Sequence, residues 1–154
     1  MLRPDANPLA ALVDRRGFAV IDGGLATTLE SHGHDLDDPL WSARLLIEDP
    51  DAVRRVHGEF LDAGADVLIT ASYQASEAGF AERGIAAEGA RALMHTSVDL
   101  ACRARDDAHE PNALVAASVG PYGAALADGS EYPRRYDLAD DGPRTLHSYP
   151  RRLL

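Results

Sequence analysis

The sequence contains no lysine and a single cysteine, Cys102, among its 154 residues. Without lysine, there is no support for an aldolase or decarboxylase that works through a lysine at a strand end. One cysteine excludes an internal disulfide and any metal site built from several thiolates of this chain alone. The sequence also lacks a run of roughly 20 apolar residues and the apolar core of a signal peptide, so we expect a cytoplasmic protein.

Basic residues are scarce relative to acidic ones. There are 15 Lys plus Arg against 25 Asp plus Glu, which gives a formal net charge of −10. Such a surplus repels phosphate backbones and anionic lipid heads, so we expect no nucleic-acid partner and no membrane association. The glycine patterns that bind dinucleotides or the phosphates of ATP are absent as well, so neither NAD nor ATP is indicated.

Three short apolar runs, residues 18–22, 66–70 and 114–118, have the length of buried strands and begin 48 residues apart. Apolar residues at helical spacing occupy both intervals between these runs and predict one crossover helix in each. Strand, helix, strand, helix, strand is typical of right-handed βαβ units. The sequence therefore predicts an α/β fold with three parallel strands in the order 1-2-3.

The helices have recognisable ends. In the first crossover helix, the apolar positions share one face: Val53, Val56, Phe60 and Leu61. Asp49 followed by proline predicts its start, and Gly64 predicts its end. Another helix is predicted from Asn7 to Arg15, ahead of the first strand. His57 and His95 are expected on helix surfaces.

Each predicted strand ends in a polar residue followed by a loop of small residues, and these polar residues are Asp22, Thr70 and Ser118. The carboxyl ends of parallel strands meet at one edge of a sheet, where the sites of such folds lie. We therefore expect the three side chains to converge on a pocket. The alternative is local, since Asp22 could cap the helix near Leu25 while Thr70 and Ser118 satisfy loop backbone groups.

The segment Asp22-Gly23-Gly24 has chemistry suited to an amino acid, because a carboxylate attracts an ammonium group and glycine N–H groups attract a carboxylate. Ser118 resembles a hydrolase nucleophile only loosely, since Ala116 replaces the first glycine of that motif. Trp41 is predicted in a loop, where an indole more often packs over a core edge than stacks on a substrate.

Five segments, in order, resemble the homocysteine S-methyltransferase family, in particular its S-methylmethionine-using members. They are residues 22–27 (DGGLAT), 38–43 (DPLWSA), 63–66 (AGAD), 70–76 (TASYQAS) and 118–132 (SVGPYGAALADGSEY). The resemblance implies a (β/α)₈ barrel, of which this chain supplies about the first three units. On this interpretation residues 1–137 form the N-terminal part of the homocysteine-binding barrel domain, and residues 138–154 form a divergent or truncated tail.

The resemblance also implies a reaction, the transfer of a methyl group from a sulfonium donor such as S-methylmethionine to homocysteine, giving methionine. It implies that the residues holding homocysteine or the donor are Asp22, Gly23, Gly24, Trp41, Thr70, Ser118 and Gly120.

The resemblance also implies a zinc ion bound by three cysteines near the ends of later strands, and here this sequence differs from the family. Because Cys102 is the sole cysteine, we assign no catalytic residue and expect no zinc to bind this chain. A free thiol with a pKa of about 8.5 is only slightly ionised at neutral pH, whereas a bound metal deprotonates it. The alternative function is that of a non-catalytic fragment that binds an amino acid weakly or pairs with a separate C-terminal half. An exposed strand edge could also allow self-association.

Overall fold

The computed structural model describes residues 7–121 and 123–124. Its helices and strands follow in the order α1 (Pro8–Arg16), α2 (Leu25–Ser31), the 3₁₀ helix η1 (Trp41–Arg44), α3 (Leu45–Glu48), α4 (Pro50–Asp62), β1 (Val67–Ile69), α5 (Glu77–Glu82), α6 (Ala87–Asp107) and β2 (Leu114–Ala116). The predicted tail 138–154 and the final part of the family segment 118–132 lie outside the described residues.

The sheet is parallel, as predicted. Strands β1 and β2 pair in register, with Val67 opposite Leu114. The first apolar run contributes one parallel bridge, between Ile21 and Val67, in place of the expected strand. This run therefore lies beside β1 on the side away from β2, which gives the predicted order 1-2-3. Two backbone hydrogen bonds form this bridge, from the Asp22 N–H to the Val67 carbonyl oxygen and from the Val67 N–H to the Val20 carbonyl oxygen.

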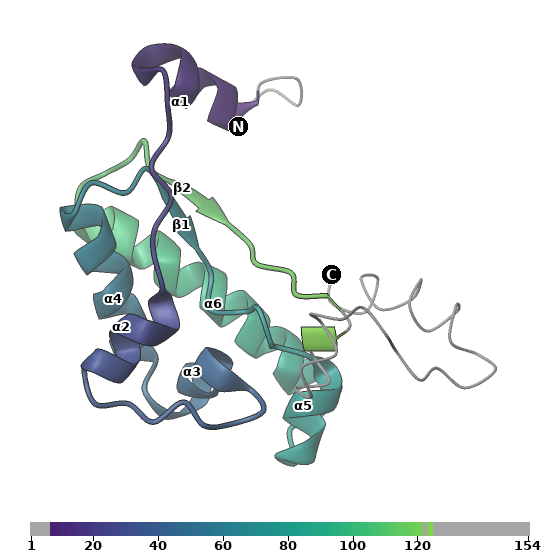
Figure 1. The fold of residues 1–154 in the computed structure, drawn as a ribbon. Coiled ribbons are helices and arrows are strands. Elements are labelled where there is room, and N and C mark those ends of the chain that lie inside the picture. The colour runs from purple at the N-terminus through teal and green to yellow at the C-terminus, as the bar shows by residue number, and fades with distance from the viewer. Residues whose placement is uncertain (1–6, 122, 125–154) are drawn as a thin grey trace.

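Helices α4 and α6 are the two crossover helices, and they pack against each other beside the strands (Figure 1). Helix α4 begins where predicted, since the Asp49 side chain accepts a hydrogen bond from the N–H of Ala52 at 3.0 Å. It ends just before Gly64, whose φ of 95° lies in the left-handed region that favours glycine. The mixed α/β class predicted from the sequence is thus confirmed.

His57 lies in the core, so its predicted place on a helix surface is wrong. The residue has 0% exposure, and neither ring nitrogen has a hydrogen-bond partner among the described residues. Burial lowers the pKa of His57 from 6.5 to about 4. The position follows Val53 by four residues and Val56 by one, which places it on the apolar face of α4. His95 is exposed, as expected.

Helix α1 confirms the predicted N-terminal helix, and Asn7 caps it by accepting hydrogen bonds from two backbone N–H groups. Figure 1 shows α1 apart from the other helices, at the end where the strands begin. Its last residue, Arg16, forms an ion pair with Asp66 at 2.6 Å, and Asp66 also accepts the N–H of Val20 at 2.9 Å. Among the described residues, no helix combines the length and apolar character needed to cross a membrane.

Candidate functional site

Thr70 and Ser118, at the ends of β1 and β2, are directly connected. The N–H of Ser118 donates to Thr70 Oγ1 at 2.9 Å, and Ser72 Oγ donates to the carbonyl oxygen of Ser118 at 2.8 Å. The hydroxyl groups of Thr70 and Ser72 are themselves 2.8 Å apart. Both backbone groups of Ser118 are therefore held by the loop after β1. The structure brings these two predicted residues together. The contact from Thr70 also agrees with the alternative interpretation, in which Thr70 satisfies a backbone group of a loop.

Asp22 reaches the same end of the sheet by a different contact. Its Oδ2 accepts a hydrogen bond from the N–H of Ile69 at 2.8 Å. Its Oδ1 is buried and has no partner among the described residues. Burial raises the pKa of the Asp22 carboxyl group above its ordinary value, and the hydrogen bond from Ile69 offsets part of that rise.

The proposed role of Asp22 as a helix cap is wrong. Helix α2 starts at Leu25 with Gly24 in the cap position and has no side-chain capping hydrogen bond. The Asp22 carboxylate instead spans the gap to β1, and one of its oxygens is left for another donor. A buried acceptor without a donor costs stability, and such groups are rare enough in proteins to indicate a ligand or water that meets them.

Gly120 allows the loops after β1 and β2 to approach each other closely. A Cβ atom at this position would lie 2.0 Å from the carbonyl oxygen of Tyr73, which is far inside van der Waals contact. The glycines next to Asp22 are less tightly enclosed, since a Cβ at Gly23 would lie 3.0 Å from the Phe60 ring and one at Gly24 would lie 3.1 Å from a threonine hydroxyl. Gly120 is therefore the glycine whose replacement most disturbs this end of the sheet.

Trp41 begins η1 and is not in an irregular loop as predicted. Its φ of 49° is unusual for a residue with a side chain, and 36% of its surface is exposed. Its ring meets that of Tyr73 edge to face, with centroids 6.4 Å apart and an interplanar angle of 71°. This contact connects the segment before α3 to the loop after β1. Trp41 thus lies against a strand-end loop and keeps part of its ring accessible.

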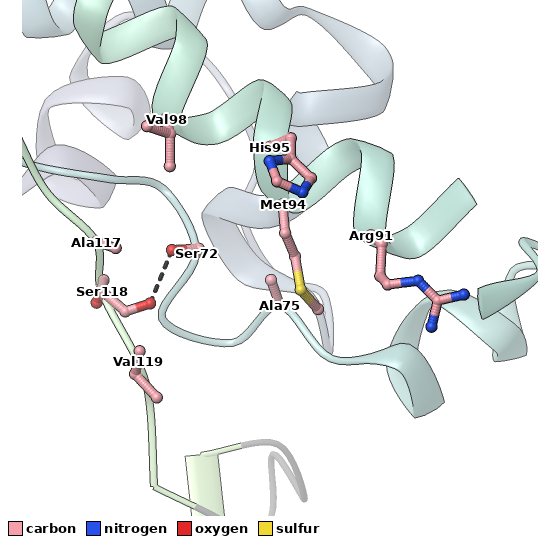
Figure 2. Close-up of a pocket in the computed structure, with 9 residues that line it drawn as sticks. All are labelled: Ser72, Ala75, Arg91, Met94, His95, Val98, Ala117, Ser118 and Val119. Atoms are coloured by element: carbon pink, nitrogen blue, oxygen red, sulfur yellow. Dashed lines mark hydrogen bonds between the residues drawn. The ribbon is translucent and has the colours of Figure 1, made fainter. Parts of the chain in front are cut away.

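A pocket of about 190 Å³ opens between α6 and the loops that follow β1 and β2 (Figure 2). Its lining residues are Ser72, Ala75, Arg91, Met94, His95, Val98, Ala117, Ser118 and Val119. Of the predicted site residues, Ser118 lines this pocket, whereas Asp22, Trp41 and Thr70 do not. The predicted residues thus share the carboxyl end of the sheet, but this pocket lies to one side of it, against α6.

Three residues near the site were not singled out from the sequence: Ser72, Tyr73 and Gln74. Ser72 holds Ser118, Tyr73 contacts both Trp41 and the Gly120 position, and Gln74 has a buried side-chain oxygen with no partner among the described residues. All three lie in the segment 70–76, which was one of the strongest points of resemblance. The resemblance of that segment to the family was the feature of the sequence that could have identified these three residues.

The described residues do not form the three-cysteine zinc site that the family resemblance implies. Cys102 is on α6 and only partly buried. In residues 7–121 and 123–124, no group of three or more histidine, cysteine or acidic side chains could hold a metal ion. A zinc ion with four ligands would need groups beyond those that this described part of the chain brings together.

The fold and the strand-end loops define an α/β protein with a parallel sheet and a candidate site at the carboxyl ends of its strands. The family model for homocysteine S-methyltransferases matches residues 19–150. The chain therefore belongs to the homocysteine S-methyltransferase family.

Relatives of known name support this assignment over most of the chain. The homocysteine S-methyltransferase of Escherichia coli K12 is 49% identical over 146 residues, covering 92% of this chain and 47% of the relative. Homocysteine S-methyltransferase 1 of Brassica oleracea var. italica is 51% identical over 143 residues, covering 85% of this chain and 44% of the relative.

A solved structure has a similar fold. The metallated form of the homocysteine methyltransferase MmuM from Escherichia coli matches with a TM-score of 0.83 at 47% identity, covering 96% of this chain and 52% of that chain. The chain thus spans about half the length of the relatives it matches, and it corresponds to their N-terminal portion.

Proposed function

We propose that this chain is the N-terminal part of an enzyme that methylates homocysteine. The reaction breaks an S–CH₃ bond of a sulfonium donor such as S-methylmethionine and forms a new S–CH₃ bond on the homocysteine sulfur. The homocysteine thiol loses its proton, and both sulfur compounds leave as methionine. The observation that carries the proposal is the Asp22 carboxylate, which is half satisfied by Ile69 and has a second buried oxygen without a partner among the described residues.

In this proposal Asp22 binds the ammonium group of homocysteine. A cation beside the carboxylate favours its ionised form and offsets the desolvation that raises its pKa in the free chain. The backbone of Gly23 and Gly24 offers N–H groups for the substrate carboxylate. Charge-assisted hydrogen bonds of this kind are roughly twice as strong as neutral ones, so they provide both affinity and orientation.

Trp41 and the loop after β2 complete the proposed site. The exposed part of the Trp41 ring provides an aromatic surface for a sulfonium cation, which aromatic faces attract through their quadrupole. Thr70 holds Ser118 in place, and Gly120 lets that loop approach the Tyr73 carbonyl. Binding and orientation of the two reactants are the tasks we assign to these residues.

The three parallel segments form the start of a (β/α)₈ barrel in this proposal, with residues 1–137 as its N-terminal part. The match to a structure nearly twice as long supports this, since this chain covers 52% of it. Zinc, when bound by thiolates from the remainder of the enzyme, would supply a deprotonated homocysteine sulfur at neutral pH. Cys102 takes no part in that set.

A chimera tests the proposal directly. This chain is joined to the portion of the Escherichia coli enzyme that it does not cover, and methionine formation from homocysteine and S-methylmethionine is measured. We expect activity from the chimera and none from the chain alone. Asp22→Asn, which keeps the size of the side chain but removes its charge, should raise the KM for homocysteine at least tenfold, roughly the value of one charge-assisted hydrogen bond. A folded chimera with no activity would refute the proposal.

The second candidate function is that of a fragment that associates with another chain. It is favoured by the apolar residues exposed along the first run, where Phe18 is 56%, Val20 38% and Ile21 58% exposed. An open strand edge with apolar side chains is a surface for pairing. Sedimentation velocity over a range of concentrations tests it, and a strictly monomeric chain would exclude self-association.

A further inference from the structure

We infer that Gln74 is a second ligand-binding residue, which accepts a hydrogen bond from the same primary ammonium group that Asp22 binds. The inference rests on the proposed function, because it names a further residue for the proposed amino-acid site. It also defines what that site selects, namely a ligand with several N–H donors on one cationic nitrogen.

The starting observation is a pair of unpartnered acceptors at one end of the sheet. Gln74 Oε1 and Asp22 Oδ1 are both buried, and neither has a hydrogen-bond partner among the described residues. Asp22 follows the bridge to β1, and its other oxygen is held at Ile69, the last residue of that strand. Gln74 lies in the loop that leaves the same strand. The two acceptors therefore come from adjoining segments at the carboxyl end of β1.

The other buried polar atoms without a partner belong to different surroundings. His57 lies in the core on α4, and Arg44 has Glu48 one helical turn away at 3.0 Å. His57 lies on α4 and Arg44 on η1, so neither residue belongs to the loops after the strands. The unsatisfied atoms at the strand ends are thus of one kind, hydrogen-bond acceptors, and this indicates the chemistry of the missing donor.

Gln74 is held in place from several sides. Its neighbour Tyr73 contacts the Trp41 ring, and the Tyr73 carbonyl lies against Gly120. Its other neighbour, Ala75, is buried with 2% exposure. A loop fixed in this way before a ligand arrives does not need to be ordered by it, so a side-chain acceptor on it adds affinity at little entropic cost.

A primary ammonium group matches two such acceptors. It carries three N–H donors and a positive charge, so it can bind the carboxylate of Asp22 and the amide oxygen of Gln74 at once. A sulfonium centre has no N–H donor and cannot satisfy Gln74. The inference therefore assigns Gln74 to the amino group of the amino acid and not to the sulfonium group of the donor.

Calorimetric titration of the 154-residue chain tests this assignment with two ligands, homocysteine and its analogue with a hydroxyl group in place of the ammonium group. Gln74→Leu should weaken homocysteine binding roughly tenfold and leave the analogue's binding unchanged, because one hydrogen bond to a charged donor is lost. Gln74→Glu keeps an acceptor and should retain or improve homocysteine binding. Asn112→Ala, which removes an exposed amide elsewhere, is the matched control.

The outcomes separate this inference from the proposed function. If Asp22→Asn weakens homocysteine binding and neither Gln74 variant changes it, the inference is wrong and the proposed site stands. If the unsubstituted chain binds no homocysteine, the proposed site itself fails and the inference falls with it. If Gln74→Leu does not fold, Gln74→Glu decides the question. If Gln74 has only a structural role, the buried carboxylate of this variant should lower the melting temperature, and the preference for homocysteine over the hydroxyl analogue should be lost.

Discussion

Acidification should destabilise this chain through His57, and replacing that histidine by leucine should remove the effect. The His57 side chain has no exposed surface, and no described residue bonds to either of its ring nitrogens. Its pKa is lowered by burial from 6.5 to about 4, so in the folded chain the ring is neutral down to that pH.

The sign and size of the effect follow from proton binding. Between pH 6.5 and about 4 the unfolded chain takes up a proton on His57 that the folded chain excludes, so stability is lost as the pH falls through this window. At about 1.4 kcal/mol for each pKa unit, the full loss is about 3 kcal/mol. Small domains have a total stability of about 5 to 15 kcal/mol, so this single group is a considerable fraction of it.

Urea unfolding followed by circular dichroism measures the effect across that pH range. Carboxylates titrate in the same window, so the informative quantity is the difference in unfolding free energy between the unsubstituted chain and His57→Leu. We expect this difference to shift by about 3 kcal/mol in favour of the variant as the pH falls to about 4. His95→Gln, at an exposed position on α6, should follow the unsubstituted chain. A difference that stays constant across the window would refute the reasoning.

Three further changes have expected effects on the free energy of unfolding, measured at neutral pH. Gly120→Ala should cost about 3 kcal/mol or more, because its Cβ would lie 2.0 Å from a backbone carbonyl oxygen, whereas Gly58→Ala, in open space on α4, should stabilise by about 1 kcal/mol. Thr70→Val should cost about 1 to 3 kcal/mol, because the Ser118 N–H loses its acceptor. Asp49→Ala should cost about 1 kcal/mol through the lost cap of α4.

Each of these expectations can fail separately. A Gly120→Ala chain as stable as the Gly58→Ala chain would show that the two loops are free to move apart. An unchanged stability for Thr70→Val would mean that water replaces its hydroxyl group. A neutral Asp49→Ala would mean that water meets the Ala52 N–H as well as the carboxylate does.

The sequence predicted the parts of the fold that depend on local chemistry. Aspartate followed by proline favours a helix start at Asp49, and glycine favours the left-handed position at Gly64. Both ends of α4 were therefore predicted correctly. The first strand was predicted from its apolar character alone. Its pairing with β1 is limited to the Ile21 bridge, and how far two strands pair depends on contacts between distant segments, which local sequence does not encode.

The site was predictable in its location and less so in its contacts. The order of strands and helices placed Asp22, Thr70 and Ser118 at the same end of the sheet. Asp22 accepts a hydrogen bond from the N–H of Ile69 and does not cap α2. This choice depends on the position of Asp22 relative to β1, which local sequence does not determine. The burial of His57 could have been predicted, because its position on the apolar face of α4 already indicated it. The prediction of a surface position came from the polar nature of histidine.

The long-range hydrogen bonds of the sheet have a consequence for folding during synthesis. Arg16 and Val20 reach Asp66 across 50 and 46 residues, and Thr70 reaches Ser118 across 48. Each connection therefore spans about one repeat of the architecture, and none of these spans two. The first repeat can close as it leaves the ribosome, before the second is translated, because the entropy of closing a loop grows only slowly with its length. Translation pauses placed after residue 66 or after residue 118 would then act on separate folding events.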